Sequence, residues 1–215
     1  MKYGVLTLIV LSLLGACSNE KEATESNFKK AAQANFDVEG PPCYFITRMP
    51  APMDQSDKAS NDKLLALKEA GLLEAKKAAK ITVYGIFDKP REEYAPGFEL
   101  TEEGKKYFKE GVDEALIGPP LGGFCFGKRE VVEITNFTEP KDLNGRHFAE
   151  VHYKYKITDL PDWAKKPEIY NAFEKDNHGQ ESLKKALDSE RAPIKKSDMF
   201  ILTNKGWMHN KQFRD

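Results

Sequence analysis

A period-two alternation of side chains over residues 147–157 most constrains how this chain can fold. The side chains of one parity are His147, Ala149, Val151, Tyr153, Tyr155 and Ile157. Successive side chains of a β-strand point to opposite faces of its sheet, so this spacing predicts a strand with one buried and one solvated face. Strands of that kind are typical of antiparallel sheets. We therefore expect pairing with the strand-like stretch 124–137 as a hairpin.

Helical spacing appears mainly in the first half of the chain. Phe28, Ala31, Ala32 and Phe36 predict a helix over residues 26–37. Leucines predict a second helix that starts near residues 57–61 and ends at Gly71, where Leu67 and Leu72 are placed for the apolar contact of a Schellman cap. A strand is expected at 80–87, a loop at 88–97 and a third helix from Thr101 to Leu116.

These elements predict an α+β fold, with a mainly antiparallel sheet and helices packed on one side. We expect a single globular domain over residues 26–215. It divides into a helical half, 26–117, and a strand-rich half, 118–215.

Part of the helical half resembles the end of a winged-helix module. The resemblance is carried by residues 64–73, which include Ala70-Gly71-Leu72-Leu73, and by Leu100-Thr101-Glu102-Glu103-Gly104. It implies a helix, a β-hairpin wing and the start of the next helix, with the first helix and the strand near Cys43 as earlier elements. It departs from the module at residues 48–58, where a proline-bearing loop replaces a clear second helix.

Charge argues against the DNA binding that a winged helix suggests. The chain of 215 residues has a formal net charge of −1. Asp62, Lys63, Lys68 and Glu69 give the helix that would enter the groove a mixed face rather than a basic one. We expect no nucleic-acid partner.

The N-terminus has the pattern of a secretory signal. Lys2 precedes an apolar run of 11 residues from Gly4 to Leu14, which is shorter than the roughly 20 residues needed to span a bilayer as a helix. Leu14, Gly15 and Ala16 then lead into Cys17. This stretch resembles the lipobox of bacterial lipoproteins; the alternative is an ordinary cleaved signal.

The resemblance implies that residues 1–16 are removed and that Cys17 carries the lipid. Residues 17–25 are small, polar and charged, and they predict a flexible tether. Ser18 stands where Asp favours retention in the inner membrane of enteric-type bacteria. We therefore expect a lipid-anchored protein of the cell envelope, held at the outer membrane and facing the periplasm.

With Cys17 assigned to lipid by this resemblance, Cys43 and Cys125 remain. An exported compartment is oxidising and two cysteines allow one pairing, so we expect a Cys43–Cys125 disulfide. The alternative is two buried, reduced thiols. Nothing has the CxxC spacing of a redox-active pair.

Signatures of catalysis and metal binding are missing from the sequence. GxSxG and HExxH do not occur, and the glycine- and proline-rich residues 118–123 match no phosphate-binding loop. His147 and His152 have an odd separation on one strand and are expected on opposite faces. We expect no enzyme activity, no cofactor and no metal site.

Aromatic side chains are the remaining candidates for a binding site. They could line a pocket in a curved sheet, with ordinary core packing as the alternative reading. The candidates are Phe124, Phe126, Tyr153, Tyr155, Trp163 and Trp207.

The leading functional hypothesis is a binding or scaffolding domain held in the envelope by its lipid, with an envelope protein as partner. The first alternative is a small-molecule-binding or hydrolytic protein that uses the aromatic cleft. The second is a periplasmic immunity or inhibitor protein.

Overall fold

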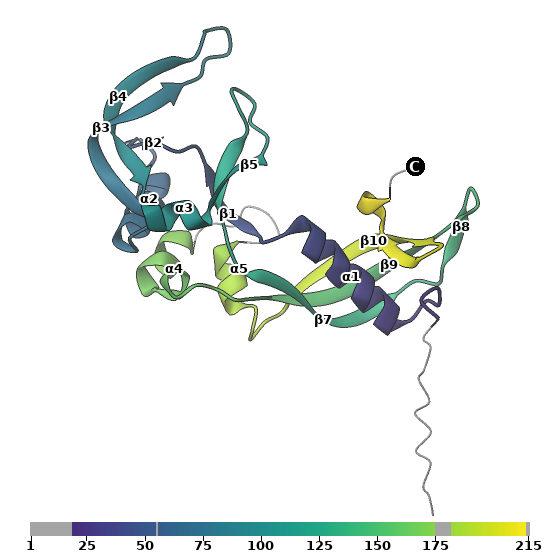
Figure 1. The fold of residues 1–215 in the computed structure, drawn as a ribbon. Helices are drawn as coiled ribbons and strands as arrows, with labels where there is room; N and C mark the ends of the chain where they lie inside the picture. Colours follow the sequence, from purple (N-terminus) through teal and green to yellow (C-terminus); the bar gives the residue numbers. More distant parts are fainter. Residues whose placement is uncertain (1–18, 55, 175–181, 214–215) are drawn as a thin grey trace, which may run out of the picture.

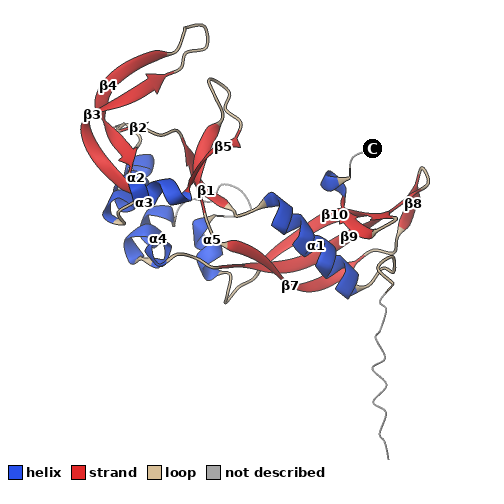
Figure 2. Cartoon of the chain, viewed as in Figure 1, coloured by secondary structure: helices blue, strands red, loops and turns tan. Residues whose placement is uncertain are grey.

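The computed structural model describes residues 19–54, 56–174 and 182–213. Helices are interspersed among runs of two to five consecutive strands, and every strand pairing in the described part of the chain is antiparallel. The predicted α+β class is therefore confirmed. The strands form three separate sheets, which Figures 1 and 2 show as one broad sheet and two narrower, projecting ones.

The broad sheet contains the alternating segment as its central strand. Its order is β11-β10-β9-β7, and β8 also pairs with β9. The strands are β7 (Lys128–Phe137), β8 (Lys141–Leu143), β9 (Arg146–Thr158), β10 (Ile194–Thr203) and β11 (Gly206–His209). Phe137 of β7 lies opposite Val151 of β9, which confirms the expected hairpin pairing. Alternate residues of β9 from Ala149 to Ile157 are buried, as the pattern predicted.

Helix α1 (Glu25–Glu39) lies across one face of this sheet (Figure 1). Its Phe28 ring is 4.9 Å from that of Phe137 and 4.8 Å from that of Trp207. About two turns further along α1, the ring of Phe36 lies 5.0 Å from that of Tyr155. The apolar side chains whose spacing predicted the helix are thus the ones that pack on the sheet.

Two three-stranded sheets form the other end of the molecule. Their orders are β1-β6-β5 and β2-β4-β3. The strands are β1 (Cys43–Thr47), β2 (Ala51–Pro52), β3 (Leu73–Val83), β4 (Arg91–Leu100), β5 (Phe108–Asp113) and β6 (Leu121–Cys125). The expected strand 124–137 is therefore divided between two sheets. Gly127, with φ of +81°, makes the break between β6 and β7.

Helix α2 (Lys58–Glu69) ends as predicted. Gly71 has φ of +85°, the Leu72 N–H donates to the Leu67 carbonyl over 2.9 Å, and the Gly71 N–H donates to Lys68. These are the two hydrogen bonds of a Schellman cap. Leu67 and Leu72 are both buried, so the cap also contributes to the core.

The prediction of a helical first half is wrong. Helix α3 (Glu102–Tyr107) is short, and the next residues form β5, where we expected helix as far as Leu116. Phe108 lies opposite Phe124 of β6 with ring centroids 5.4 Å apart, and Gly111 has φ of +69°. Cross-strand packing and a left-handed glycine thus prevail over helical spacing. The expected loop 88–97 is largely β4, which pairs along most of β3.

Only part of the winged-helix resemblance corresponds to the observed arrangement. Helix α2, the β3–β4 hairpin and α3 follow in the expected order, and β2 pairs with β4. However, α1 packs on the broad sheet and β1 pairs with β6, so neither supplies an earlier element of such a module. Met53, Asp54 and Ser56 are not helical.

Short helices fill the region between the two ends. They are η1 (Asp162–Lys165), α4 (Pro167–Phe173) and α5 (Leu183–Asp188), whereas η2 (Asn210–Gln212) follows β11 and contacts β10. Helix α4 packs on α2, and Ser189 after α5 accepts a hydrogen bond from the Ile157 N–H of β9 at 2.9 Å. The buried side chains of both ends belong to one contiguous core.

The expected flexible tether is wrong for its described residues. Asn27 of α1 donates side-chain hydrogen bonds to the carbonyls of Asn19 and Glu22, at 2.8 and 2.9 Å. Thr24 is the N-cap of α1, whose side chain accepts from the Asn27 N–H. The ordered body therefore includes residues 19–25, because polar residues that looked suited to solvent satisfy backbone groups at a helix start.

Candidate functional site

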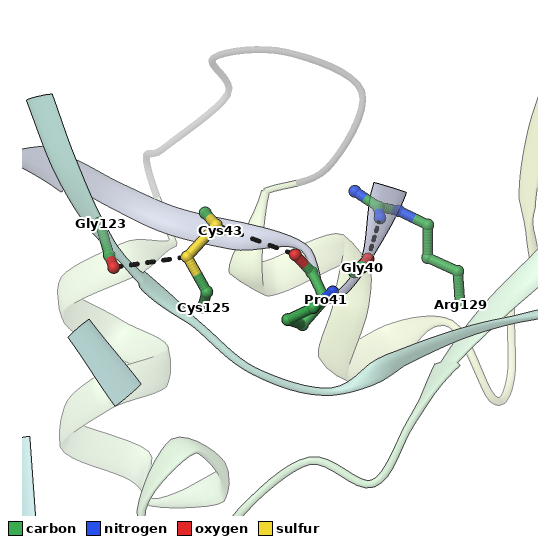
Figure 3. Close-up of a disulfide and its surroundings, with 6 residues drawn as sticks. All are labelled: Gly40, Pro41, Cys43, Gly123, Cys125 and Arg129. Atoms are coloured by element: carbon green, nitrogen blue, oxygen red, sulfur yellow. Dashed lines mark hydrogen bonds between the residues drawn. A yellow bond between two sulfur atoms is a disulfide. The ribbon is translucent and has the colours of Figure 1, made fainter. Parts of the chain in front are cut away.

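The expected disulfide links Cys43 of β1 to Cys125 of β6 (Figure 3). The two residues lie directly opposite each other in the strand pair, with Cα atoms 3.9 Å apart. Nearby, Arg129 Nη1 donates to the Gly40 carbonyl over 2.8 Å and so ties the end of α1 to β7. The bridge stands where the chain passes from α1 into the smaller sheets. The expected lipid site, Cys17, lies outside the described residues.

The six aromatic candidates are core residues and do not line one pocket. All are buried, Trp163 most exposed at 9%. Phe126 and Trp163 pack together with ring centroids 4.7 Å apart at the junction between the sheets, whereas Trp207 packs on Phe28 under α1. The others divide in the same way: Phe124 packs on Phe108, and Tyr153 and Tyr155 pack on Phe36.

An open cleft of about 210 Å³ lies instead between the two projecting hairpins. Arg48, Pro50, Tyr84, Phe108, Glu110 and Pro119 are among its lining residues. The β3–β4 hairpin supplies one wall and the β5–β6 hairpin supplies the other, so the cleft depends on how these two hairpins are held together.

Arg48 holds the two hairpins side by side. Its Nη2 donates to the carbonyls of Ile117 and Pro119, the latter at 3.0 Å, and its guanidinium carbon lies 4.7 Å from the centre of the Tyr84 ring. A Cβ atom at Gly118 would lie 2.7 Å from the Tyr84 ring. One cation therefore fixes the β5–β6 loop by hydrogen bonds and the end of the β3–β4 hairpin by a cation–π contact.

The ends of both hairpins carry exposed apolar side chains. Ile86 and Phe87 in the β3–β4 loop are 73% and 98% exposed, and Leu116 in the β5–β6 loop is 105% exposed. We call Ile86, Phe87 and Leu116 the tip residues. Single exposed apolar residues are common on protein surfaces, but several of them on two loops that one arginine links mark a candidate contact surface.

A second polar cluster lies within the broad sheet, among Tyr153, Lys196, Asp198 and His209. Tyr153 Oη donates to Asp198 Oδ2 over 2.5 Å, and Lys196 Nζ lies 3.2 Å from the same oxygen. His209 Nδ1 accepts from the Lys211 N–H, and its Nε2 lies 3.5 Å from Asp198 Oδ1.

The electrostatics of this cluster oppose proton transfer. Burial raises the pKa of Asp198, but hydrogen bonds from His209 and Tyr153 and the charge of Lys196 outweigh it and lower the pKa to about 2. Burial and the adjacent carboxylate raise the pKa of Tyr153. Asp198 is thus a fixed anion and Tyr153 a fixed neutral donor, an arrangement that fastens β9, β10 and β11 to one another.

The histidines on β9 face separate carboxylates. His147 Nδ1 is 3.8 Å from Asp142, and His152 Nε2 is 3.5 Å from Glu150. Over the described ranges, no group of three or more metal-binding side chains occurs, and no helix has the length and hydrophobicity required to cross a membrane.

Sequence reasoning missed Arg48, Tyr84 and the tip residues. The sequence signal for the β3–β4 hairpin was weak, because β3 is rich in lysine and β4 in glutamate. Residues 88–97 were therefore expected to be a loop. The Asp198 cluster was also missed, since it depends on the register of three strands. Comparisons found no matching family model, no matching curated protein and no matching solved structure.

Proposed function

We propose that this chain is a lipid-anchored envelope lipoprotein that binds a partner protein through the tip residues. Its Cys17 carries the lipid, its location is the periplasmic side of the outer membrane, and its role is binding or scaffolding. The lipobox-like residues 14–17 support the anchor. The exposed tip residues on two fastened hairpins are the observation that carries the binding role.

Burial of these side chains favours association. Transfer of apolar surface out of water contributes roughly 25 cal/mol per Å² to the free energy of association. Side chains that are fully exposed in the free protein give up no packing contacts there when they bind. Arg48 limits the relative movement of the loops, so less conformational entropy is lost on binding than for two independent loops. A protein partner with an apolar depression fits such a surface.

The test of the anchor is Cys17→Ala, which moves the protein from the membrane fraction to the soluble periplasmic fraction. Retention of the variant in the membrane fraction contradicts the anchor.

The test of binding uses photo-crosslinking residues at Phe87 or Leu116 in cells, with Leu143 as the matched control. Leu143 is also exposed, at 58%, but belongs to the β8–β9 hairpin of the broad sheet. A discrete crosslinked product is expected from 87 and 116 and not from 143. Phe87→Ser abolishes the product from 116 without changing stability. Equal products from all three positions, or none from the tips, contradict the binding role.

A further inference from the structure

The residues that follow the proposed lipid site are fastened to the folded body at two places. The Trp207 Nε1 of β11 donates to the Glu22 carbonyl over 3.1 Å, and Asn27 of α1 donates to the carbonyls of Asn19 and Glu22. Both donors are buried. Residues 19–22 also close on themselves, because the Glu22 N–H donates to the Asn19 carbonyl over 3.0 Å.

The turn between β10 and β11 is shaped to receive this segment. Gly206 has φ of +101°, and a Cβ atom there would lie 2.8 Å from the Glu20 carbonyl oxygen. The glycine therefore permits both the turn and the close approach of the N-terminal backbone. We call residues 19–22 with Gly206 and Trp207 the N-terminal clasp.

We infer that the clasp holds the domain directly on the headgroup surface of its membrane in one orientation. The inference rests on the proposed function, since it requires lipid on Cys17. Two residues span at most about 7 Å, so Asn19 cannot be further than that from the lipidated residue. The surface around the clasp therefore lies against the bilayer that holds the acyl chains.

The surface around the clasp and the overall shape agree with this orientation. Glu20, Lys21 and Glu22 of the clasp are exposed, as is Lys205 next to Gly206, so two ammonium groups are available to phosphate headgroups. The hairpins that carry the tip residues project from the opposite end of the molecule from the start of α1 (Figure 1). With the clasp on the membrane, the tip residues point away from it.

The experiment measures the distance of two positions from the headgroups. The mature lipidated protein, with one fluorescent non-natural residue at Lys205 or at Phe87, is placed in phosphatidylethanolamine–phosphatidylglycerol vesicles that contain a spin-labelled headgroup lipid. Quenching is expected to be at least threefold stronger at 205 than at 87. A ten-residue glycine–serine insertion between Ser18 and Asn19 brings the two values close together, and Asn27→Ala with Trp207→Phe reduces the difference in the protein without the insertion.

Mass spectrometry of the N-terminal peptide separates the two possible failures. A peptide without lipid overturns the proposed function and this inference with it. A lipidated protein with equal quenching at both positions, or with a difference that survives the insertion unchanged, overturns the fixed orientation alone.

Discussion

Asp198 is a largely buried carboxylate whose neighbours on three strands contribute to the stability of the fold. Its side chain is 13% exposed and receives Tyr153, Lys196 and His209 from three adjacent strands. A carboxylate buried without partners costs several kcal/mol, whereas one that accepts from Tyr153 and lies 3.2 Å from Lys196 Nζ and 3.5 Å from His209 Nε2 favours its charged form. The negative charge of Asp198 therefore stabilises the register of β9, β10 and β11 that brings these side chains together.

Replacement of Asp198 by Asn is expected to lower the free energy of unfolding by about 2 kcal/mol at pH 7. The folded pKa of about 2 lies below the usual value of 3.8, so this stabilisation is complete above about pH 4 and is lost as the pH falls through 2. Urea unfolding at several pH values measures it. The control is Asp162→Asn, at an exposed carboxylate, which leaves stability almost unchanged. A deficit for Asp198→Asn that stays constant down to pH 2 contradicts the interpretation.

At the scale of elements, local signals were predictable and partner choices were not. The burial pattern of β9, the cap of α2 at Gly71 and the start of α3 at Thr101 depend on neighbouring residues, and all three are found. The end of α3 depends on Phe108 meeting Phe124, a residue 16 positions away. Such pairing cannot be recognised from helical spacing alone, because tertiary contacts override local propensity.

The same distinction applies to the candidate site. Cys43 and Cys125 could be paired from the sequence because only one partner was available once Cys17 was assigned. The aromatic residues were correctly recognised as apolar, but apolar composition does not distinguish a pocket wall from a filled core. Arg48 and Tyr84 were missed because their contact exists only after two hairpins have formed and come together.

The Cys43–Cys125 bridge joins elements that are 82 residues apart in the chain. In the chain-entropy model, closing a loop of that length in the unfolded state contributes about 4 to 5 kcal/mol. The double variant Cys43→Ala and Cys125→Ala is expected to lose stability of that order in urea unfolding. Alkylation of the unfolded, unreduced protein is expected to modify neither cysteine. Modification of both before reduction would show that the pair is not oxidised.

At the scale of the whole molecule, a continuous core connects the broad sheet to the two projecting sheets. Phe126 and Trp163 pack at the junction, and Phe28 and Trp207 pack beneath α1. Both groups belong to the same set of contacting buried residues. A molecule connected in this way is expected to unfold as one cooperative unit, although its outline in Figure 1 suggests two lobes.

The two tryptophans allow this cooperativity to be measured, because each reports on one group. Trp207→Phe leaves Trp163 as the junction reporter, and Trp163→Phe leaves Trp207 as the reporter beneath α1. Within each variant, the fluorescence midpoint in urea is expected to coincide with the midpoint from far-ultraviolet circular dichroism. The comparison is made inside one variant, so the stability that each substitution removes does not enter. If Trp163 fluorescence changes at lower urea than the dichroism, the projecting sheets open before the broad sheet. The tip residues would then stand on a separately unfolding unit.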